Sequence, residues 1–194
     1  MNNTSRRKRI FMAGRARTGA TLTATALLLA GTAAFAAAPA HAAAPPVCAG
    51  ILPVQAQNRD MARGAEPDVV TRDSSGLSAA ERWRFFPIKP GVYALISNLL
   101  NPSGFAVVAR VTDSNQGTKI TTTPITNMQN PREHWKREEF PGQGVTYTNL
   151  FSGKRLTYRA LGGLDFEQWS IGTFNSGQFF KEVSATCLDN TPEG

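Results

Sequence analysis

The chain has 194 residues, 41% of them hydrophobic, and carries 21 basic against 14 acidic side chains, a formal net charge of +7. The first 17 residues hold six of the basic side chains and no acidic one, so the remainder is close to neutral. The overall basicity therefore gives no support to a nucleic-acid partner or to an anionic membrane as partner.

The amino terminus has the order of residues that is typical of a secretion signal. Positive charge comes first, followed by the apolar run Ala20 to Ala38 and the small-x-small pattern Ala40-His41-Ala42. We expect residues 1–42 to be a cleaved signal peptide and residues 43–194 to be one secreted, extracellular domain without a membrane anchor. Arg6-Arg7 hints at the twin-arginine route, and both that route and the Sec route stay open.

Both cysteines, Cys48 and Cys187, lie in the expected mature part, near its two ends. An exported chain meets oxidising conditions, and neither cysteine has other soft metal ligands nearby, so pairing is favoured over metal binding. The sequence predicts a Cys48–Cys187 disulfide, no metal site and no cofactor. Such a bond requires a fold that brings its two ends together.

Short stretches of Val, Ile, Thr, Tyr and Phe alternate with turn residues after the signal. None keeps the 3.6-residue apolar period of a helix, and Leu77 to Arg84 has room for one helical turn at most. The pattern predicts an all-β domain, either a sandwich or a barrel. The clearest strands are expected at 91–98, 105–111, 119–123, 145–149 and 154–158.

A repeated Glu-x-Trp signature narrows this choice. Each of the three tryptophans, Trp83, Trp135 and Trp169, ends one copy. After the first two copies a Phe-Pro pair, a Gly-Val pair and a Ser-Gly pair follow in the same order. Unequal spacings of this size suit four-stranded units with variable loops. Three such units closing around a pseudo-threefold axis make a β-trefoil, in which the first and last strands are neighbours.

This series of Trp, Gly-x-Tyr, Asn, Ser-Gly and a further Trp resembles the ricin B-type β-trefoil lectins, whose repeats end in Gln-x-Trp. The resemblance covers about Val54 to Val183. It implies a noncatalytic carbohydrate-binding protein with all three tryptophans in the structural core, where one large aromatic per repeat serves packing. The alternative role for these tryptophans is a sugar-stacking platform, because an aromatic face suits the axial C–H groups of a pyranose; the core role is favoured. The family's Gln is Glu in the first two copies, and in the third copy Gln168 stands next to the tryptophan.

Sugar sites of the resembled family use an Asp just after Ser-Gly, an aromatic on the next hairpin, and an Asn or Gln close before the repeat-ending Trp. In the second repeat Val107 or Val108 stands where the Asp belongs, and a threonine near Thr123 stands where the aromatic belongs. The polar residues nearby are therefore the candidate carbohydrate-binding residues, although such residues also make ordinary turns. They are Asp113, Asn115, Gln116, Asn127 and Asn130.

The other two repeats offer less. The third leaves little room for a hairpin between Ser152-Gly153 and Trp169. The first has charged residues, Asp60 and Arg72 among them, but no aromatic before Trp83.

Catalysis is not expected. His134 is the one histidine after the signal, no Gly-x-Ser-x-Gly is present, and metal ligands at close spacing are absent from the sequence. Glu138 and Glu139 are adjacent in an expected strand and should point to opposite faces. A glycan-cleaving enzyme would need a carboxylate pair that meets in one pocket.

The sequence therefore predicts a secreted, noncatalytic lectin-like protein whose partner is a glycan or a cell-wall polysaccharide. The alternative is a β-trefoil that binds a secreted protein, such as a protease inhibitor or an accessory subunit of a secreted toxin or enzyme. That alternative is motivated by the missing sugar-site positions and by the long loops 58–73 and 113–131.

Overall fold

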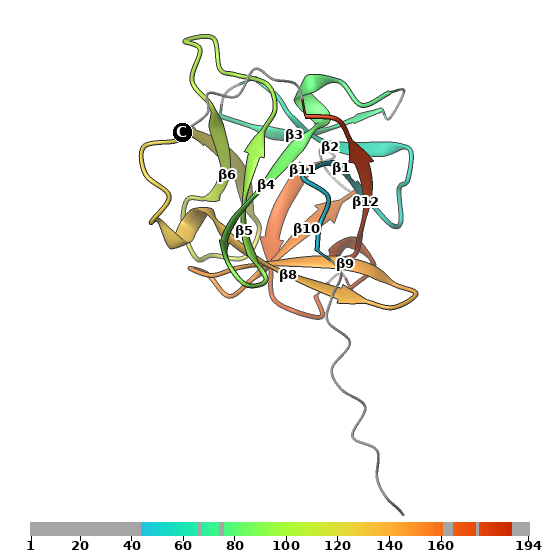
Figure 1. Ribbon diagram of the computed structural model, residues 1–194. Coiled ribbons are helices and arrows are strands. Elements are labelled where there is room, and N and C mark those ends of the chain that lie inside the picture. The colour runs from blue at the N-terminus through green and yellow to red at the C-terminus, as the bar shows by residue number, and fades with distance from the viewer. Residues whose placement is uncertain (1–43, 66, 74–75, 161–164, 174, 188–194) are drawn as a thin grey trace, which may run out of the picture. The chain divides into compact units, whose positions relative to one another are not determined.

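The computed structural model describes residues 44–187, apart from 66, 74–75, 161–164 and 174 (Figure 1). Within this part of the chain twelve strands and three short 3-10 turns are formed. The all-β fold expected from the sequence is confirmed. None of the helices described is long and apolar enough to cross a membrane. The expected signal peptide, 1–42, lies outside the described residues and stays a prediction.

The strands form three units of four, and a 3-10 turn precedes the last strand of each. The first unit comprises β1 (Cys48–Pro53), β2 (Arg59–Arg63), β3 (Val69–Asp73), η1 (Ala79–Glu81) and β4 (Trp83–Lys89). The second comprises β5 (Val92–Ser97), β6 (Val107–Val111), β7 (Thr118–Pro124), η2 (Pro131–Glu133) and β8 (His134–Phe140). The third comprises β9 (Gly144–Asn149), β10 (Arg155–Arg159), β11 (Asp165–Trp169), η3 (Asn175–Gln178) and β12 (Phe180–Ala185).

The outer strands of the units pair into a closed ring, and the inner strands form one hairpin per unit. Around the ring β1 pairs with β4, β4 with β5, β5 with β8, β8 with β9, β9 with β12, and β12 with β1. The hairpins are β2–β3, β6–β7 and β10–β11. The expectation that the first and last strands are neighbours is confirmed, because β1 and β12 pair from Cys48↔Ala185 to Pro53↔Phe180.

One large aromatic residue per unit begins or nearly begins the last strand. Trp83 and Trp135 are fully buried, as predicted, and their indole N–H groups donate to the carbonyls of Met61 (2.8 Å) and Ala109 (3.1 Å) on the second strand of the same unit. The third such position belongs to Phe180, which is also fully buried. Its ring centroid lies 5.9 Å from that of Tyr147.

The placement of Trp169 in the core is wrong. Trp169 ends the hairpin strand β11 and is half-buried. The third copy of the motif is Gln178-Phe179-Phe180, which begins at the last residue of η3 as Glu81-Arg82-Trp83 begins at the last residue of η1. The position two residues before the aromatic is buried in each unit, and the third unit has the family's Gln there. Phe180 fills the space, so a third core tryptophan is not needed.

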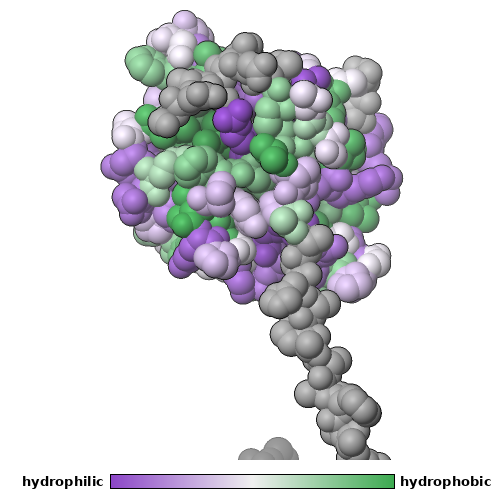
Figure 2. All heavy atoms as spheres, viewed as in Figure 1, coloured by the Kyte–Doolittle hydropathy of each residue, from purple (hydrophilic) through white to green (hydrophobic). Residues whose placement is uncertain are grey.

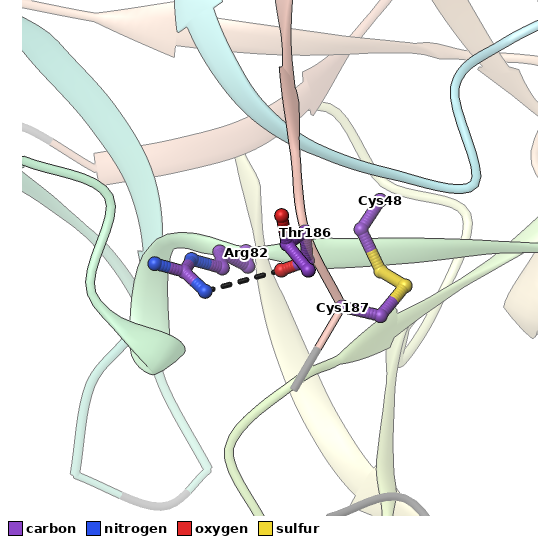
Figure 3. Close-up of a disulfide and its surroundings, with 4 residues drawn as sticks. All are labelled: Cys48, Arg82, Thr186 and Cys187. Carbon is purple, nitrogen blue, oxygen red and sulfur yellow. Dashed lines mark hydrogen bonds between the residues drawn. A yellow bond between two sulfur atoms is a disulfide. The ribbon is translucent and has the colours of Figure 1, made fainter. Parts of the chain in front are cut away.

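A disulfide joins the two ends of the described domain, as the sequence predicts (Figure 3). Cys48 on β1 and Cys187, just after β12, have Cα atoms 5.4 Å apart at a sequence separation of 139. Arg82 donates beside this bond from Nη1 to the Thr186 carbonyl at 3.1 Å, and from Nε to the Leu77 carbonyl at 2.8 Å. The closing strand pair is therefore fixed covalently and by hydrogen bonds.

On the face drawn in Figure 2, hydrophobic and hydrophilic residues are interspersed. The exposed aromatics among the described residues are Phe86, Phe105 and Phe151.

Replacing Trp135 by alanine should destabilise the fold by about 3 to 5 kcal/mol, because a fully buried ring and its hydrogen bond are lost. Replacing Trp169 by alanine should cost less than about 2 kcal/mol, because that ring is half-buried. Urea unfolding followed by far-UV circular dichroism gives both values. Equal losses would contradict the exchange of Trp169 for Phe180 in the core.

Replacing both cysteines by serine should lower the free energy of unfolding by roughly 4 to 5 kcal/mol, because the bond closes a very long loop in the unfolded chain. The Arg82→Ala variant is the control, since it removes the neighbouring hydrogen bonds and keeps the covalent link. The free energies of unfolding of the oxidised and the reduced parent protein should differ by the same amount as those of the parent and the double variant. A difference under about 1 kcal/mol would show that β1–β12 pairing alone closes the ring.

Candidate functional site

Three of the five candidate ligands lie together in the turn between β6 and β7. Asp113 lies two residues after the end of β6, and its Oδ1 accepts hydrogen bonds from the Asn115 backbone N–H at 2.7 Å and from the Thr118 hydroxyl at 2.5 Å. Gln116 is exposed, and Gly117 follows it with a positive φ of 76°. The sequence-based grouping of Asp113, Asn115 and Gln116 therefore corresponds to one turn.

The other two candidates, Asn127 and Asn130, hold the backbone between β7 and η2. Asn127 Oδ1 accepts from the Gln129 N–H at 3.1 Å. Asn130 caps η2, because its Oδ1 accepts from the Arg132 N–H at 3.1 Å and its Nδ2 donates to Glu133 Oε1 at 3.2 Å. Their amide oxygens thus serve local turns.

Arg132 connects η2 with the β6–β7 turn. Its Nη1 donates to the carbonyl of Thr112, directly before Asp113. Its guanidinium carbon lies 4.4 Å from the ring centroid of Phe151, which is 40% exposed. On the same side Lys154 Nζ donates to the Ser114 carbonyl at 2.6 Å. The β9–β10 loop therefore brings an aromatic ring and an ammonium group beside the turn.

The strand β11 holds the opposite side of the turn. Gln168 is fully buried, and its Nε2 donates to the carbonyls of Asp113 (2.7 Å) and Asn115 (2.9 Å). Gln116 Nε2 donates to the Ser170 hydroxyl at 2.8 Å. These bonds join the end of the third hairpin to the turn of the second.

Trp169 packs on this turn. A side chain at Gly117 would come within 3.3 Å of its Cζ2 atom, so the glycine permits the indole to lie against the backbone. The indole N–H donates to Glu167 Oε2 at 2.8 Å, and the Arg159 guanidinium carbon lies 5.1 Å from a ring centroid of Trp169. Its side chain offers an apolar body with its polar group already satisfied.

We call the surface formed by Asp113, Gln116, Phe151, Lys154 and Trp169 the turn surface. The Thr118 hydroxyl is the first cause that lowers the pKa of the Asp113 carboxyl, followed by the Asn115 N–H and the charges of Arg132 and Lys154. The carboxylate is therefore ionised at neutral and mildly acidic pH. Its Oδ2 has no hydrogen-bond partner in the described part of the chain and can accept a hydrogen bond from a ligand hydroxyl.

Sequence reasoning missed Phe151, Lys154 and Trp169 as members of this surface. Phe151 directly precedes the Ser152-Gly153 turn, and a large aromatic in a turn is a signal of exposure that could have found it. Trp169 was assigned to the core because its Glu-x-Trp letters match those of Trp83 and Trp135. Lys154 has no comparable signal.

The expectation that the third repeat leaves little room for a hairpin between Ser152-Gly153 and Trp169 is also wrong. β10 and β11 form one, with Arg155 opposite Trp169, because the repeat ends at Phe180. Trp169 thus stands on the hairpin, where the resembled family carries its aromatic. The stretch from Gly153 to Arg159 contains no Asp, and Gln178 is fully buried, with its Nε2 donating to the Ser170 carbonyl at 2.9 Å.

A hollow of about 380 Å³ lies elsewhere, where the β8–β9 hairpin meets β12 and the segment that follows β1. Its charged walls include Arg137, Glu139 and Glu182. Arg137 and Glu182 are 6% and 7% exposed and form a bidentate pair, Nε to Oε1 at 2.8 Å and Nη2 to Oε2 at 2.9 Å. The Tyr147 hydroxyl donates to Glu182 Oε1 at 2.5 Å, and burial, with the charge of Glu182, raises the Tyr147 pKa.

The carboxylates of Glu139 and Glu182 both line this hollow, and both approach Arg137. Glu139 Oε2 lies 3.6 Å from Arg137 Nη1. Glu138 points away and pairs with Lys136 at 2.7 Å on the surface, as the strand alternation predicts. Glu182 accepts hydrogen bonds from the buried side chains of Arg137 and Tyr147. We assign the Arg137–Glu182 pair a role in stabilising the barrel.

Solved structures are similar to the chain, whereas neither a protein-family model nor a curated protein matches it. A designed threefold-symmetric protein, ThreeFoil, is 14% identical with a TM-score of 0.57, over 71% of this chain and 99% of its own. The lectin of Polyporus squamosus, bound to the epitope Neu5Aca2-6Galb1-4GlcNAc, is 14% identical with a TM-score of 0.59, over 73% of this chain. The protein has the β-trefoil fold. It spans half of the length of that lectin chain.

A toxin has the same fold. The cytolethal distending toxin of Haemophilus ducreyi is 10% identical with a TM-score of 0.53, over 74% of this chain and 89% of its own.

Truncating Glu182 to alanine should destabilise this β-trefoil by about 3 to 5 kcal/mol, because the buried Arg137 guanidinium loses its counter-charge. The Glu138→Ala variant is the matched control, since it removes a carboxylate of the exposed pair with Lys136 and should cost no more than about 1 kcal/mol. Chemical unfolding at neutral pH measures both. Two equal and small losses would show that the Arg137–Glu182 pair does not support the barrel.

Proposed function

We propose that the protein is a secreted, noncatalytic carbohydrate-binding protein and that the turn surface holds the sugar. One observation carries this proposal: the ionised Asp113, with Oδ2 unbonded within the described residues, lies on a turn that Phe151 flanks on one side and Trp169 on the other. A carboxylate oxygen accepts hydrogen bonds from sugar hydroxyls, and an aromatic ring packs on the apolar face of a pyranose.

The fold supports this assignment. Among the β-trefoils that the chain resembles are lectins, and one of them is bound to a sialylated trisaccharide epitope. The site differs from the family pattern, since the aromatic Trp169 comes from the third unit and the carboxylate of Asp113 from the second. We infer that a composite site between two units replaces the single-unit sites of the family.

Secretion completes the proposal. The disulfide between Cys48 and Cys187 is suited to an oxidising compartment, and the predicted signal peptide over 1–42 would direct the domain 43–194 there. The ligand class is then a glycan at the cell surface or a cell-wall polysaccharide.

The test is binding of the purified protein to a broad glycan array and to isolated cell-wall polysaccharide, followed by titration of the ligand found. Trp169→Ala and Asp113→Asn should each weaken binding about tenfold or more, because a stacking surface or a charge-assisted acceptor is lost. The affinity should stay nearly constant from about pH 7 to pH 5, because the pKa of Asp113 is lowered.

Phe86 provides a matched control for Phe151. Phe86 and Phe151 are 42% and 40% exposed, but Phe86 lies on β4, a strand that contributes no residue to the turn surface. Phe151→Ala should weaken binding, and Phe86→Ala should leave it unchanged. The proposal fails if nothing binds at millimolar ligand, or if all variants bind as the parent does.

A second candidate is the accessory subunit of a secreted toxin, with a protein as partner. The likeness to the Haemophilus ducreyi toxin supports it. Recovery of one specific secreted protein from culture medium, with no glycan retained, would favour this function over the first.

A further inference from the structure

Asp60 is a buried carboxylate that the fold does not use. Its side chain on β2 is fully buried, and neither Oδ1 nor Oδ2 has a hydrogen-bond partner in the described part of the protein. Asp60 directly precedes Met61, whose carbonyl accepts from the Trp83 indole, and in the second unit Val108 stands before the corresponding acceptor Ala109. An apolar residue therefore satisfies the packing at this position.

The carboxylate lies on the wall of a hollow of about 200 Å³. The other walls are Leu52, Leu77, Val183 and Gly76. The hollow is thus bounded by strands β1, β2 and β12 and by the segment before η1. Of the described residues that line it, Asp60 alone has a polar side chain.

Gly50 on β1 leaves space beside the carboxylate. A side chain there would come within 3.2 Å of Asp60 Oδ1 and 2.4 Å of Leu77 Cδ2. Because the glycine has no Cβ, Leu77 can pack over the strand beside the carboxylate and form a wall of the hollow.

Among the residues that the structure describes, no cation pairs with Asp60. On the same strand Arg59 pairs with Asp73 at 2.8 Å, and Arg63 Nη1 donates to the Leu100 carbonyl at 2.8 Å. Arg72, opposite Asp60 in the hairpin, is exposed and forms no ion pair with it.

The nearby charge that acts on Asp60 is negative. Glu81 of η1 is buried, and its Oε2 accepts from the Ser78 N–H at 2.6 Å. Burial first, and Glu81 second, raise the pKa of Asp60 to about 6. At neutral pH the hollow therefore holds an unpaired negative charge, which a proton or a bound cation would stabilise.

The residues that line the hollow indicate which kind of cation fits there. The described residues contain no group of three or more His, Cys, Asp or Glu side chains that could hold a metal ion. A primary ammonium on a short carbon stem instead matches the hollow, because its charge would meet Asp60 and its methylene groups would pack on Leu52, Leu77 and Val183.

We propose that the hollow beside Asp60 is a binding site for a primary alkylammonium group, presented by a free amine or by a lysine side chain. This site is separate from the turn surface and does not depend on the proposed sugar binding.

The test is titration of the purified protein with n-butylammonium chloride at about pH 7.5, with sodium chloride to keep the ionic strength constant. Carbon-13 shifts of the Leu52, Leu77 and Val183 methyl groups should change and saturate. Neutral 1-butanol, with the same stem, should bind about tenfold more weakly or not at all. At about pH 5 ammonium binding should weaken several-fold, because Asp60 takes up a proton while the amine stays charged.

Two variants separate charge from shape. Asp60→Asn keeps the side-chain volume and should abolish saturation. Asp73→Asn removes a carboxylate from the neighbouring strand, 75% exposed, and should leave ammonium binding unchanged. Val183→Phe should also abolish binding by filling the hollow while the Asp60 carboxylate remains.

A blocked lysine, acetylated at its α-nitrogen and amidated at its carboxyl, distinguishes the two sources. Binding of both probes supports a lysine side chain as occupant, and binding of butylammonium alone supports a free amine. The proposal is overturned if Asp60→Asn binds as the parent does, if 1-butanol binds equally well, or if no methyl shift saturates.

Discussion

The pairing of β1 with β12 is the constraint on which the rest of the fold depends. Three units close into one ring only if the last strand returns beside the first, and here six residue pairs and a disulfide bring it there. Closure leaves the ring without an open edge for another chain to pair with. It also buries the aromatic residue that each unit contributes.

Both surfaces proposed to bind ligands lie where separate strands and loops meet. The turn surface combines the β6–β7 turn with β11 and the β9–β10 loop, through the bonds of Gln168 and Lys154 to turn carbonyls. The hollow beside Asp60 has walls from β1 and β12 as well as β2. Each is therefore assembled from parts of the sequence that are far apart, so neither forms until the units pack.

The sequence predicted the features that local chemistry decides. Turn residues and β-branched runs located β5, β6, β7, β9 and β10, and the two cysteines predicted the disulfide. Prediction from the sequence failed where tertiary packing chooses between segments with similar motifs. Glu167-Gln168-Trp169 reads like the other motif copies, but strand pairing assigns the third core position to Phe180, because a phenylalanine fills that space as well. The candidate binding residues were found only in part, since a linear pattern identified the acidic turn at Asp113 but not the aromatics that packing of the third unit places beside it.

The disulfide has a consequence for how this domain can be carried by other proteins. Because Cys48 and Cys187 are 5.4 Å apart, the chain enters and leaves the described domain at one point. A domain with adjacent ends can be inserted into a surface loop of a host protein, or permuted to new ends, without stretching its own strands. In such a fusion the disulfide would keep the two points where the domain joins its host close together even while the strands of the domain unfold.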